Sequence, residues 1–377
     1  MSQSAEQAVL DAHYMARALE LARKGRYTTH PNPRVGCVIV RDGQVVGEGW
    51  HVRAGEPHAE VHALRAAGDQ ARGATAYVTL EPCSHHGRTP PCADALVGAG
   101  VARVVAAMQD PNPQVAGRGM GRLAEAGIVV HSGVLEGEAR AINKGFLKRM
   151  EHGLPYVRVK LAMSLDGRTA MASGESQWIT GPAARSAVQR LRAESSVVLT
   201  GADTVLADGA RLTVRAAELG LDAEQTALAM GRPPLRVLVD GRLRVPLDAP
   251  FFKAGPALVA TCVAVEEQYA NGPECLIVPG ADGQVDLRRL LEELAARGVN
   301  EVLVEAGPRL AGAFARQGLV DEYQIFVAGK FLGSSARPLL DWPLEQMSEA
   351  PMLKIIEIRA VGDDWRVTAI PAPSASV

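Results

Sequence analysis

Short apolar segments alternate with amphipathic helix patterns along this chain, and this alternation limits its possible folds more than any other feature. In the first part of the sequence, strands are expected at residues 35–40, 44–48, 76–80, 101–107 and 128–131. Helices are expected from the N-terminus to Gly25 and at residues 58–67, 93–99 and 120–126. A chain that keeps switching between strand and helix builds a sheet covered by helices on both faces. The pattern therefore predicts an α/β protein.

A second series of the same kind follows a helix and connector at residues 140–153. Its strands are expected at residues 156–162, 196–200, 235–240, 257–261, 275–278, 301–305, 322–327 and 365–370, and its helices at 183–193, 287–297 and 309–316. No internal repeat relates the two series. Because 377 residues exceed what one hydrophobic core normally holds, we expect two domains, residues 1–150 and 151–377.

Composition narrows the possible partners. Forty basic and forty-two acidic residues argue against an extended nucleic-acid surface, although a small anion site remains compatible with this balance. The apolar runs are far shorter than the ~18 residues that a membrane helix needs. The N-terminus lacks a basic segment followed by an apolar one, and five scattered cysteines do not form a disulfide framework. We therefore expect a cytoplasmic protein that binds neither nucleic acid nor membrane.

The strongest chemical signal is a set of zinc-ligand residue types. His58 and Glu60 open a predicted helix, Cys83 follows a proline, and Cys92 heads another predicted helix. One imidazole and two thiolates would leave the fourth tetrahedral position of Zn²⁺ to water, as in catalytic zinc sites. Zinc lowers the pKa of that water to about 7 and makes hydroxide available. Glu60 is then the residue expected to transfer protons, and not a ligand.

Other histidines and cysteines receive simpler interpretations. A single histidine is usually packed or exposed without a chemical role, so the zinc hypothesis depends on the conjunction of His58, Glu60 and the two cysteines. His62, His85 and His86 are interpreted as substrate or ligand-supporting contacts at most. The remaining cysteines, Cys37, Cys262 and Cys275, are interpreted as ordinary packed residues.

The segments around these residues resemble a known family. The cytidine-deaminase-like superfamily combines H-x-E with P-C-x-x-C, whereas this chain has eight residues between Cys83 and Cys92. This longer spacing, together with residues 29–37 and 55–60, is similar to the pyrimidine deaminase of riboflavin biosynthesis. The resemblance implies a cytidine-deaminase-like α/β/α domain in which Asn32 contacts the pyrimidine, since an amide can both donate and accept hydrogen bonds. Without the resemblance, Asn32 is equally well a turn residue between two prolines.

The second half contains a glycine-containing segment, residues 305–312, between an expected strand and an expected helix. The amides at the start of such a helix can bind phosphate. The segment lacks the Lys and Ser/Thr of a Walker loop, because Ala313 and Phe314 stand there, and it is not a G-x-G-x-x-G motif. Taken alone, it is better interpreted as a strand–helix turn.

Several segments of this half resemble the reductase of the same pathway, namely residues 160–167, 174–179, 204–208 and 212–215. That domain is similar to dihydrofolate reductase in fold and uses NADPH. The resemblance implies that one group of residues contacts the dinucleotide: Ala162, Trp178, Thr204, Asp208 and the loop of Gly307, Pro308, Arg309, Leu310, Ala311, Gly312 and Ala313. It implies that a second group contacts the phosphorylated substrate: Ser176, Arg192, Leu212, Arg215 and Glu305.

Two of these substrate residues, Arg192 and Arg215, can bind phosphate through two hydrogen bonds. Without the resemblance, each would be interpreted as an exposed helix or loop arginine. Lys160, Asp208 and Glu305 are candidate catalytic residues of the reduction, and the sequence does not choose among them. The family continues Asp208 with Asp-Pro, whereas this chain has Gly209 and Ala210, which makes the loop less rigid.

The resemblance implies a bifunctional enzyme of riboflavin biosynthesis. Zinc-dependent deamination of 2,5-diamino-6-(5-phosphoribosylamino)pyrimidin-4-one would yield 5-amino-6-(5-phosphoribosylamino)uracil, and NADPH would then reduce the ribosyl group to a ribityl chain. We expect a homo-oligomer, since paired α/β domains of this kind often associate. A tRNA or other nucleic-acid deaminase is one alternative, and it predicts a basic aromatic surface. A structural zinc module is the other, and it requires a fourth protein ligand such as His85 or His86.

Overall fold

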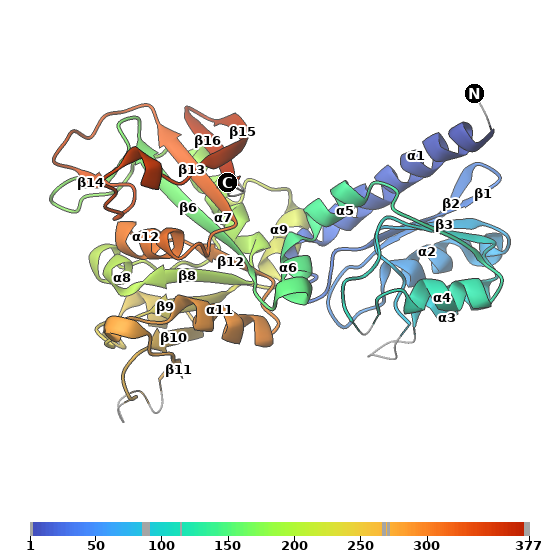
Figure 1. Ribbon diagram of the computed structural model, residues 1–377, viewed down its shortest axis with the longest axis horizontal. Coiled ribbons are helices and arrows are strands. Elements are labelled where there is room, and N and C mark those ends of the chain that lie inside the picture. Colours follow the sequence, from blue (N-terminus) through green and yellow to red (C-terminus); the bar gives the residue numbers. More distant parts are fainter. Residues whose placement is uncertain (1–2, 85–90, 114, 266–268, 270–271, 373–377) are drawn as a thin grey trace. The chain divides into compact units, whose positions relative to one another are not determined.

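The computed structural model describes residues 3–84, 91–113, 115–265, 269 and 272–372 (Figure 1). The chain divides into two compact units, Met1–Gly153 and Leu154–Val377. Each unit contains a large sheet with helices on both faces, so the predicted α/β class is confirmed. None of the described helices combines the length and the apolar content needed to cross a membrane.

The first unit is built on a five-stranded sheet with the order β2-β1-β3-β4-β5. The strands are β1 (Gly36–Arg41), β2 (Gln44–Trp50), β3 (Thr75–Val78), β4 (Arg103–Ala106) and β5 (Val129–Ser132). The helices are α1 (Gln3–Arg23), α2 (Ala59–Ala67), α3 (Cys92–Ala99), α4 (Arg118–Glu125), α5 (Glu136–Ile142) and α6 (Lys144–His152). β1 runs antiparallel to β2 and β3, while β3, β4 and β5 are parallel.

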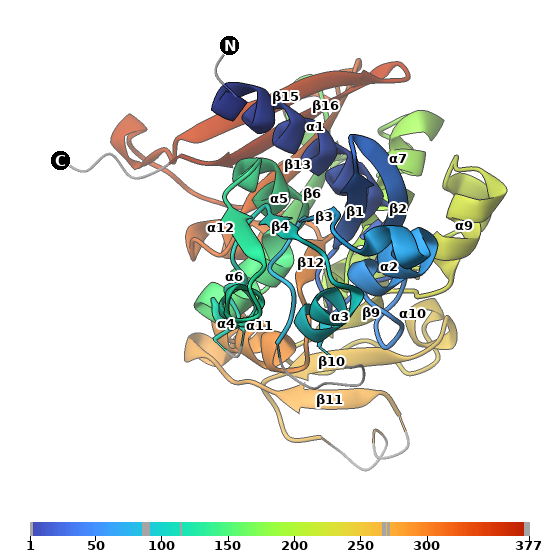
Figure 2. The same ribbon diagram turned by 90° about the vertical axis from the view of Figure 1, so that its right-hand side faces the viewer.

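Alternation of side chains along β1 divides the first core into two layers. Val38 and Val40 pack with α1, α5 and α6, whereas Cys37 and Ile39 point to the opposite face and pack with α2 and α3. In Figure 2, α1 and α5 lie above β1, β3 and β4, and α2 and α3 lie below them. The result is an α/β/α sandwich.

Two glycines bring α2 unusually close to the sheet. A Cβ atom at Gly47 would lie 2.2 Å from the carbonyl oxygen of Ala63, and one at Gly49 would lie 2.3 Å from that of Ala59. A larger residue at either of these two positions would therefore push α2 away. This close packing holds the beginning of α2, where His58 and Glu60 are found.

The second unit contains a nine-stranded sheet with the order β11-β10-β9-β8-β12-β6-β13-β16-β15. Its strands are β6 (Tyr156–Ser164), β8 (Val197–Gly201), β9 (Leu235–Val239), β10 (Ala257–Thr261), β11 (Glu274–Ile277), β12 (Glu301–Val304), β13 (Glu322–Ala328), β15 (Leu353–Val361) and β16 (Asp364–Pro371). From β11 to β13 the neighbouring strands are parallel, and β16 and β15 add an antiparallel edge. A short pair, β7 (Arg168–Ala170) and β14 (Arg337–Pro338), forms a separate ribbon.

Helices cover both faces of this second sheet. They are α7 (Pro182–Glu194), α8 (Ala202–Asp208), α9 (Ala223–Met230), α10 (Pro250–Lys253), α11 (Leu287–Ala296) and α12 (Pro308–Arg316). Residues of α11 and α12 pack with Val157, Val159 and Leu199 on one face. Residues of α7, α8 and α10 pack with Val198 and Leu238 on the other. Successive residues of β8 therefore contribute to opposite cores.

Some elements differ from the prediction. The segment expected as one helix and connector at 140–153 is divided between α5 and α6 at Asn143, whose side chain bonds both the backbone N–H and the carbonyl of Arg34. β15 was not predicted because its side chains are exposed along almost its whole length, which leaves no alternation of buried and exposed residues. α8 and α9 were also missed, because α8 buries only Ala202 and Val205 and α9 only Ala229, so neither has a long apolar face.

Candidate active sites

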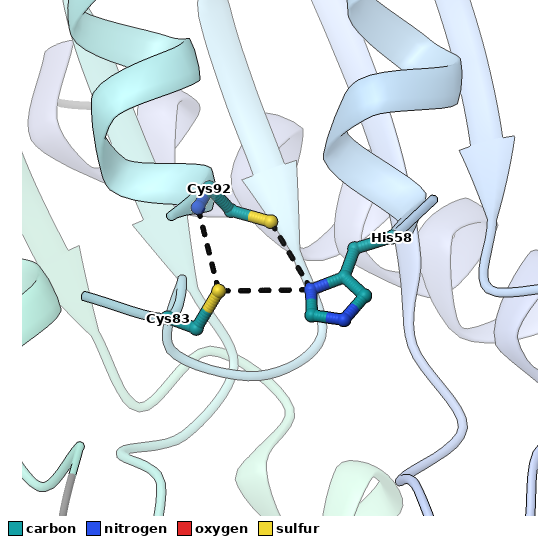
Figure 3. A group of neighbouring side chains, drawn as sticks. All are labelled: His58, Cys83 and Cys92. Atoms are coloured by element: carbon teal, nitrogen blue, oxygen red, sulfur yellow. Dashed lines mark hydrogen bonds between the residues drawn. The ribbon is translucent and has the colours of Figure 1, made fainter. Parts of the chain in front are cut away.

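Three potential zinc ligands meet at one end of the first unit. His58 precedes the first residue of α2, Cys83 lies in the connection that follows β3, and Cys92 is the first residue of α3. The Nδ1 atom of His58 is 3.6 Å from Cys83 Sγ and 3.3 Å from Cys92 Sγ (Figure 3). All three ligand atoms lie within 4.8 Å of one another.

The geometry and the chemistry of this cluster fit zinc. Tetrahedral bonds of about 2.0–2.1 Å to nitrogen and 2.3 Å to sulfur place such ligands about 3.6 Å apart. The backbone N–H of Cys92 donates to Cys83 Sγ over 3.3 Å. Hydrogen bonds from Cys92 and from His58 lower the pKa of the Cys83 thiol, which favours the thiolate form that binds metal.

The cluster supplies three ligands from the described residues, and no fourth His, Cys, Asp or Glu in those ranges joins it. That arrangement leaves a coordination position for water, as catalytic zinc sites do. His85 and His86, which the structural-zinc alternative invoked, lie outside the described residues. His62 is described but does not belong to the cluster, and its buried Nε2 has no hydrogen-bond partner in the described part of the chain.

Glu60 lies in the first turn of α2 and is only 3% exposed. Its Oε2 atom is buried and has no hydrogen-bond partner among the described residues. Burial raises the pKa of Glu60, while the neighbouring His58 opposes this rise. A buried carboxyl group with an elevated pKa beside a metal site can accept and return a proton.

Asn32 is connected to this cluster through a histidine that the sequence analysis missed. The Asn32 Nδ2 atom lies 3.1 Å from His51 Nε2, and His51 Nδ1 lies 3.2 Å from the carbonyl oxygen of Pro57. Burial lowers the pKa of His51 to about 4, so its ring is neutral, with Nδ1–H donating to Pro57 and Nε2 accepting from Asn32. The His51 ring also lies edge-on to that of His58, with centroids 5.1 Å apart.

Glu81 is a second residue that sequence reasoning missed. It is 3% exposed and lies two positions before Cys83. Its Oε2 accepts from the backbone N–H groups of Asp110 and Gly117, over 3.1 and 2.9 Å, and its Oε1 accepts from those of Gly119 and Met120, over 2.9 and 3.2 Å. One carboxylate thus joins the Cys83 segment to the start of α4. An acidic residue directly after an apolar strand was the available signal.

The second unit contains a cavity of about 1790 Å³ above the carboxyl ends of β6, β8, β9 and β12. Ligands of open α/β sheets commonly bind at this edge. The cavity exceeds the 300–1,000 Å³ typical of a single small ligand. The predicted residues that line it are Lys160, Ala162, Ser176, Trp178, Arg192, Thr204, Asp208, Leu212, Arg215, Glu305, Gly307, Pro308, Arg309, Leu310 and Ala313.

Two predicted residues do not line the cavity. Ala311 and Gly312 are buried within α12, and a Cβ atom at Gly312 would lie 2.6 Å from the carbonyl oxygen of Asp341. Gly312 therefore serves close packing. At the beginning of α12, Gly307 donates its backbone N–H to Thr204 Oγ1 over 3.2 Å, which joins the two strand–helix turns that face the cavity.

Charged groups are buried at one end of this cavity. Arg192 binds Glu305 through two hydrogen bonds, Nε to Oε1 at 2.6 Å and Nη2 to Oε2 at 2.9 Å. Burial raises the pKa of Glu305, but Arg192 and then Lys160 outweigh this effect and leave it lowered. Burial also lowers the pKa of Lys160. Glu305 engages Nε and Nη2 of Arg192, and Nη1 donates to the carbonyl oxygen of Thr213 over 3.0 Å, so each nitrogen of this guanidinium group already has a partner.

The other predicted substrate and cofactor residues have partners of their own. Arg215 Nη1 bonds Glu218 Oε1 at 2.6 Å, and Ser176 Oγ donates to Asp208 Oδ1 at 3.3 Å. Trp178 is 58% exposed and lies under the Arg185 guanidinium, 4.6 Å from the ring centroid. A largely exposed aromatic ring beside a large cavity is available to a ligand.

Comparison with known proteins assigns a family to each unit. Residues 9–108 match the cytidine and deoxycytidylate deaminase zinc-binding region, and residues 155–367 match the RibD C-terminal domain. The riboflavin biosynthesis protein RibD of Escherichia coli is 57% identical over 94% of this chain and 97% of its own length. The protein of the same name from Haemophilus influenzae is 50% identical over 96% and 97%.

Solved structures are similar over the same extent. RibD of Acinetobacter baumannii has 47% identity and a TM-score of 0.89, covering 97% of this chain and 100% of that one. A diaminohydroxyphosphoribosylaminopyrimidine deaminase/5-amino-6-(5-phosphoribosylamino)uracil reductase from Thermotoga maritima has 33% identity and a TM-score of 0.85, with the same coverage.

Proposed function

The chain belongs to the RibD family of riboflavin biosynthesis proteins, and from this premise we propose which of its residues carry out the two reactions of that family. It is a bifunctional enzyme with a zinc-dependent deaminase activity and a reductase activity. The nucleic-acid deaminase alternative is not favoured, because these relatives match almost the whole chain, including the second unit.

The proposal assigns deamination to the first unit, with His58, Cys83 and Cys92 as zinc ligands. The observation that carries this assignment is the convergence of the three ligand atoms beside Glu60, whose Oε2 atom has no hydrogen-bond partner among the described residues. When bound, zinc supplies Lewis acidity that lowers the pKa of water to about 7. Glu60 accepts the proton of the attacking water and delivers it to the departing amine, and Asn32, oriented by His51, holds the pyrimidine edge.

The deaminase assignment is tested by replacing Glu60 with Gln in the full-length chain. We expect ammonia release to fall by about 10²–10⁴-fold, the usual contribution of a general acid–base group, with zinc content unchanged. Glu125→Gln, an exposed substitution in α4, is the matched control. Reduction of preformed 5-amino-6-(5-phosphoribosylamino)uracil should be unaffected in both variants. Full ammonia release by Glu60→Gln would contradict the role of Glu60.

The second unit is proposed to hold NADPH and the phosphorylated ribosylaminopyrimidine in its 1790 Å³ cavity. When bound, the nicotinamide supplies the hydride that opens the ribosyl group. Lys160, Glu305 and Arg192 form the charged end of the cavity, and Lys160 is the residue best placed to give up a proton, since burial already lowers its pKa. Thr204 and Gly307 face the dinucleotide, and Arg215 faces the substrate phosphate.

The reductase assignment is tested by following ammonia release and NADPH absorbance separately. A zinc chelator should abolish ammonia release from the diamino substrate and leave reduction of the preformed uracil compound intact. Lys160→Met should lower the reduction rate without changing ammonia release. Loss of both activities on chelation, in a protein that remains folded, would contradict two independent sites.

We also propose that the chain forms a homodimer through β15. This strand lies at the edge of the second sheet, and Leu353, Ile355, Ile356 and Ile358 are between 38% and 57% exposed. An unpaired edge strand that exposes four large apolar side chains normally needs a covering element, and antiparallel pairing of two copies would satisfy the free backbone groups of this edge. Ile356→Lys should convert a dimer to a monomer in sedimentation; unchanged mass would refute this interface.

The five free cysteines support a reducing, cytoplasmic location.

A further inference from the structure

The large cavity extends across several neighbouring strands, and its two ends differ in chemistry. Figure 1 shows β6, β12, β8 and β9 side by side in the second unit. Lys160 and Glu305 line the cavity at the β6–β12 end, and Gly241, Arg242 and Arg244 line it after β9. Three strand spacings, ~14 Å in total, separate these ends. An extended dinucleotide whose reacting ring lies near Lys160 therefore directs its other end toward β9.

The middle of the cavity is suited to the pyrophosphate of such a ligand. Gly307 precedes α12, a helix of nine residues whose first turn lines the cavity. Free backbone N–H groups at a helix N-terminus attract phosphate. With the pyrophosphate between β12 and β8, the adenosine ribose falls above the connection that follows β9.

Most charged groups around this connection are already paired. Asp240 is 2% exposed, accepts from the Val245 backbone N–H over 2.8 Å and does not line the cavity. Arg244 bonds Asp203 at 2.8 Å and lies 3.8 Å from Asp240. Arg309 lies 3.6 Å from the same Asp203. The two carboxylates thus balance Arg244 and Arg309.

Arg242 is different from these neighbours. It is exposed, lines the cavity, and has no hydrogen bond or ion pair among the described residues. A guanidinium group binds a phosphate ester through two parallel hydrogen bonds and has no comparable interaction with a hydroxyl group. In dinucleotide-binding proteins, an arginine near the adenosine ribose is the usual way to accommodate a 2′-phosphate.

We propose that Arg242 binds the 2′-phosphate of NADPH and thereby makes the second unit prefer NADPH to NADH. This inference rests on the proposed function of the cavity and adds the residue that determines cofactor choice. Removing one charge-assisted contact should weaken NADPH binding by about 10–100-fold. NADH has a hydroxyl group at this position, so its affinity should stay within about twofold of the wild-type value.

The test measures equilibrium binding of NADPH and NADH to the full-length chain by titration calorimetry, without substrate. Arg242→Gln is compared with Arg288→Gln, an exposed α11 substitution that removes the same charge outside the cavity lining. The proposal expects only Arg242→Gln to lose NADPH affinity, with NADH affinity retained. Arg242→Lys should recover part of the loss, because a single ammonium keeps the charge without the fork.

Three results would overturn the proposal, and they point to different errors. Equal losses of NADPH and NADH affinity in Arg242→Gln would mean that Arg242 serves the whole adenosine or the fold. If Arg242→Gln retained the preference for NADPH, another residue would have to recognise the 2′-phosphate. Binding of neither nucleotide to the wild-type chain would refute the proposed function of the cavity itself.

Discussion

Replacing Glu81 by Gln is the perturbation whose consequence the structure defines most sharply. The carboxylate of Glu81 accepts four backbone N–H groups, two on each oxygen. Glutamine has the same shape but only one carbonyl oxygen, and its NH₂ group is a donor. Whichever way the amide turns, two backbone donors will face another donor and lose their hydrogen bonds.

The expected loss follows from the number of orphaned donors. A buried N–H group left without an acceptor costs about 1–3 kcal/mol, so two of them cost about 2–6 kcal/mol. The damage is local, because Glu81 joins residues 108–120 to the segment that carries Cys83. We therefore expect Glu81→Gln to loosen Cys83, the proposed zinc ligand, as well as to lower the free energy of unfolding of the first unit.

The assay is a urea titration of the zinc-loaded full-length chain, in which release of zinc to a chromogenic chelator reports unfolding of the first unit. Glu138→Gln, an exposed substitution in α5 that removes the same charge, is the control. Glu81→Gln should release zinc at markedly lower urea, whereas Glu138→Gln should match the wild type within about 0.5 kcal/mol. Equal midpoints for the two variants would refute the reasoning.

Three other changes have defined outcomes. Burial raises the pKa of Asp11, but hydrogen bonds from Arg103 and the other partners of Asp11 outweigh burial and leave this pKa below 3.8. The contribution of Asp11 to stability is therefore complete above pH 3.8 and is lost as the pH falls through the lowered pKa. Asp11→Asn should cost about 1.5–3 kcal/mol in urea unfolding at pH 7, and the difference from wild type should vanish at strongly acidic pH; a constant difference would contradict this. Glu305→Ala leaves the buried Arg192 charge unpaired and should lower unfolding free energy by about 3–5 kcal/mol, and adding Arg192→Met should recover part of it in thermal unfolding. Gly47→Ala should cost at least about 1–3 kcal/mol, since its Cβ would lie 2.2 Å from a carbonyl oxygen of α2; wild-type stability would show that α2 can move freely.

The general architecture could be predicted because it depends on local periodicity. The buried parallel strands β8 and β12 contain the apolar runs 197–199 and 302–304, and α11 shows a strong amphipathic period, so these elements are visible without tertiary information. β15 lacks such a signal, because exposure on both of its faces removes the alternation. β15 lies at the sheet edge because it pairs with β16, and this contact with another segment of the chain cannot be seen in the sequence of β15 itself.

The zinc cluster shows how far residue types can indicate a site. His58, Glu60, Cys83 and Cys92 could be named because a zinc site requires His and Cys residue types that are uncommon in this combination, and the structure brings the three ligand atoms together. The Asn32–His51 contact and the four hydrogen bonds of Glu81 could not be derived in the same way. They join segments far apart in the chain, and common polar residues carry no spacing that identifies their partners.

The amino-acid sequence by itself determined the α/β class and the succession of two series of elements, and it supplied the residue types from which the zinc ligands are proposed. These depend on periodicity and residue type, which act over a few positions. Only the tertiary structure decided which charged side chains form ion pairs with a neighbour and which remain available to a ligand. Arg192, Arg244 and Arg242 cannot be distinguished by residue type. In the structure, Arg192 pairs with Glu305 and Arg244 pairs with Asp203, whereas Arg242 pairs with no described carboxylate. The difference arises because an ion pair depends on distance in space, which folding sets between residues remote in sequence.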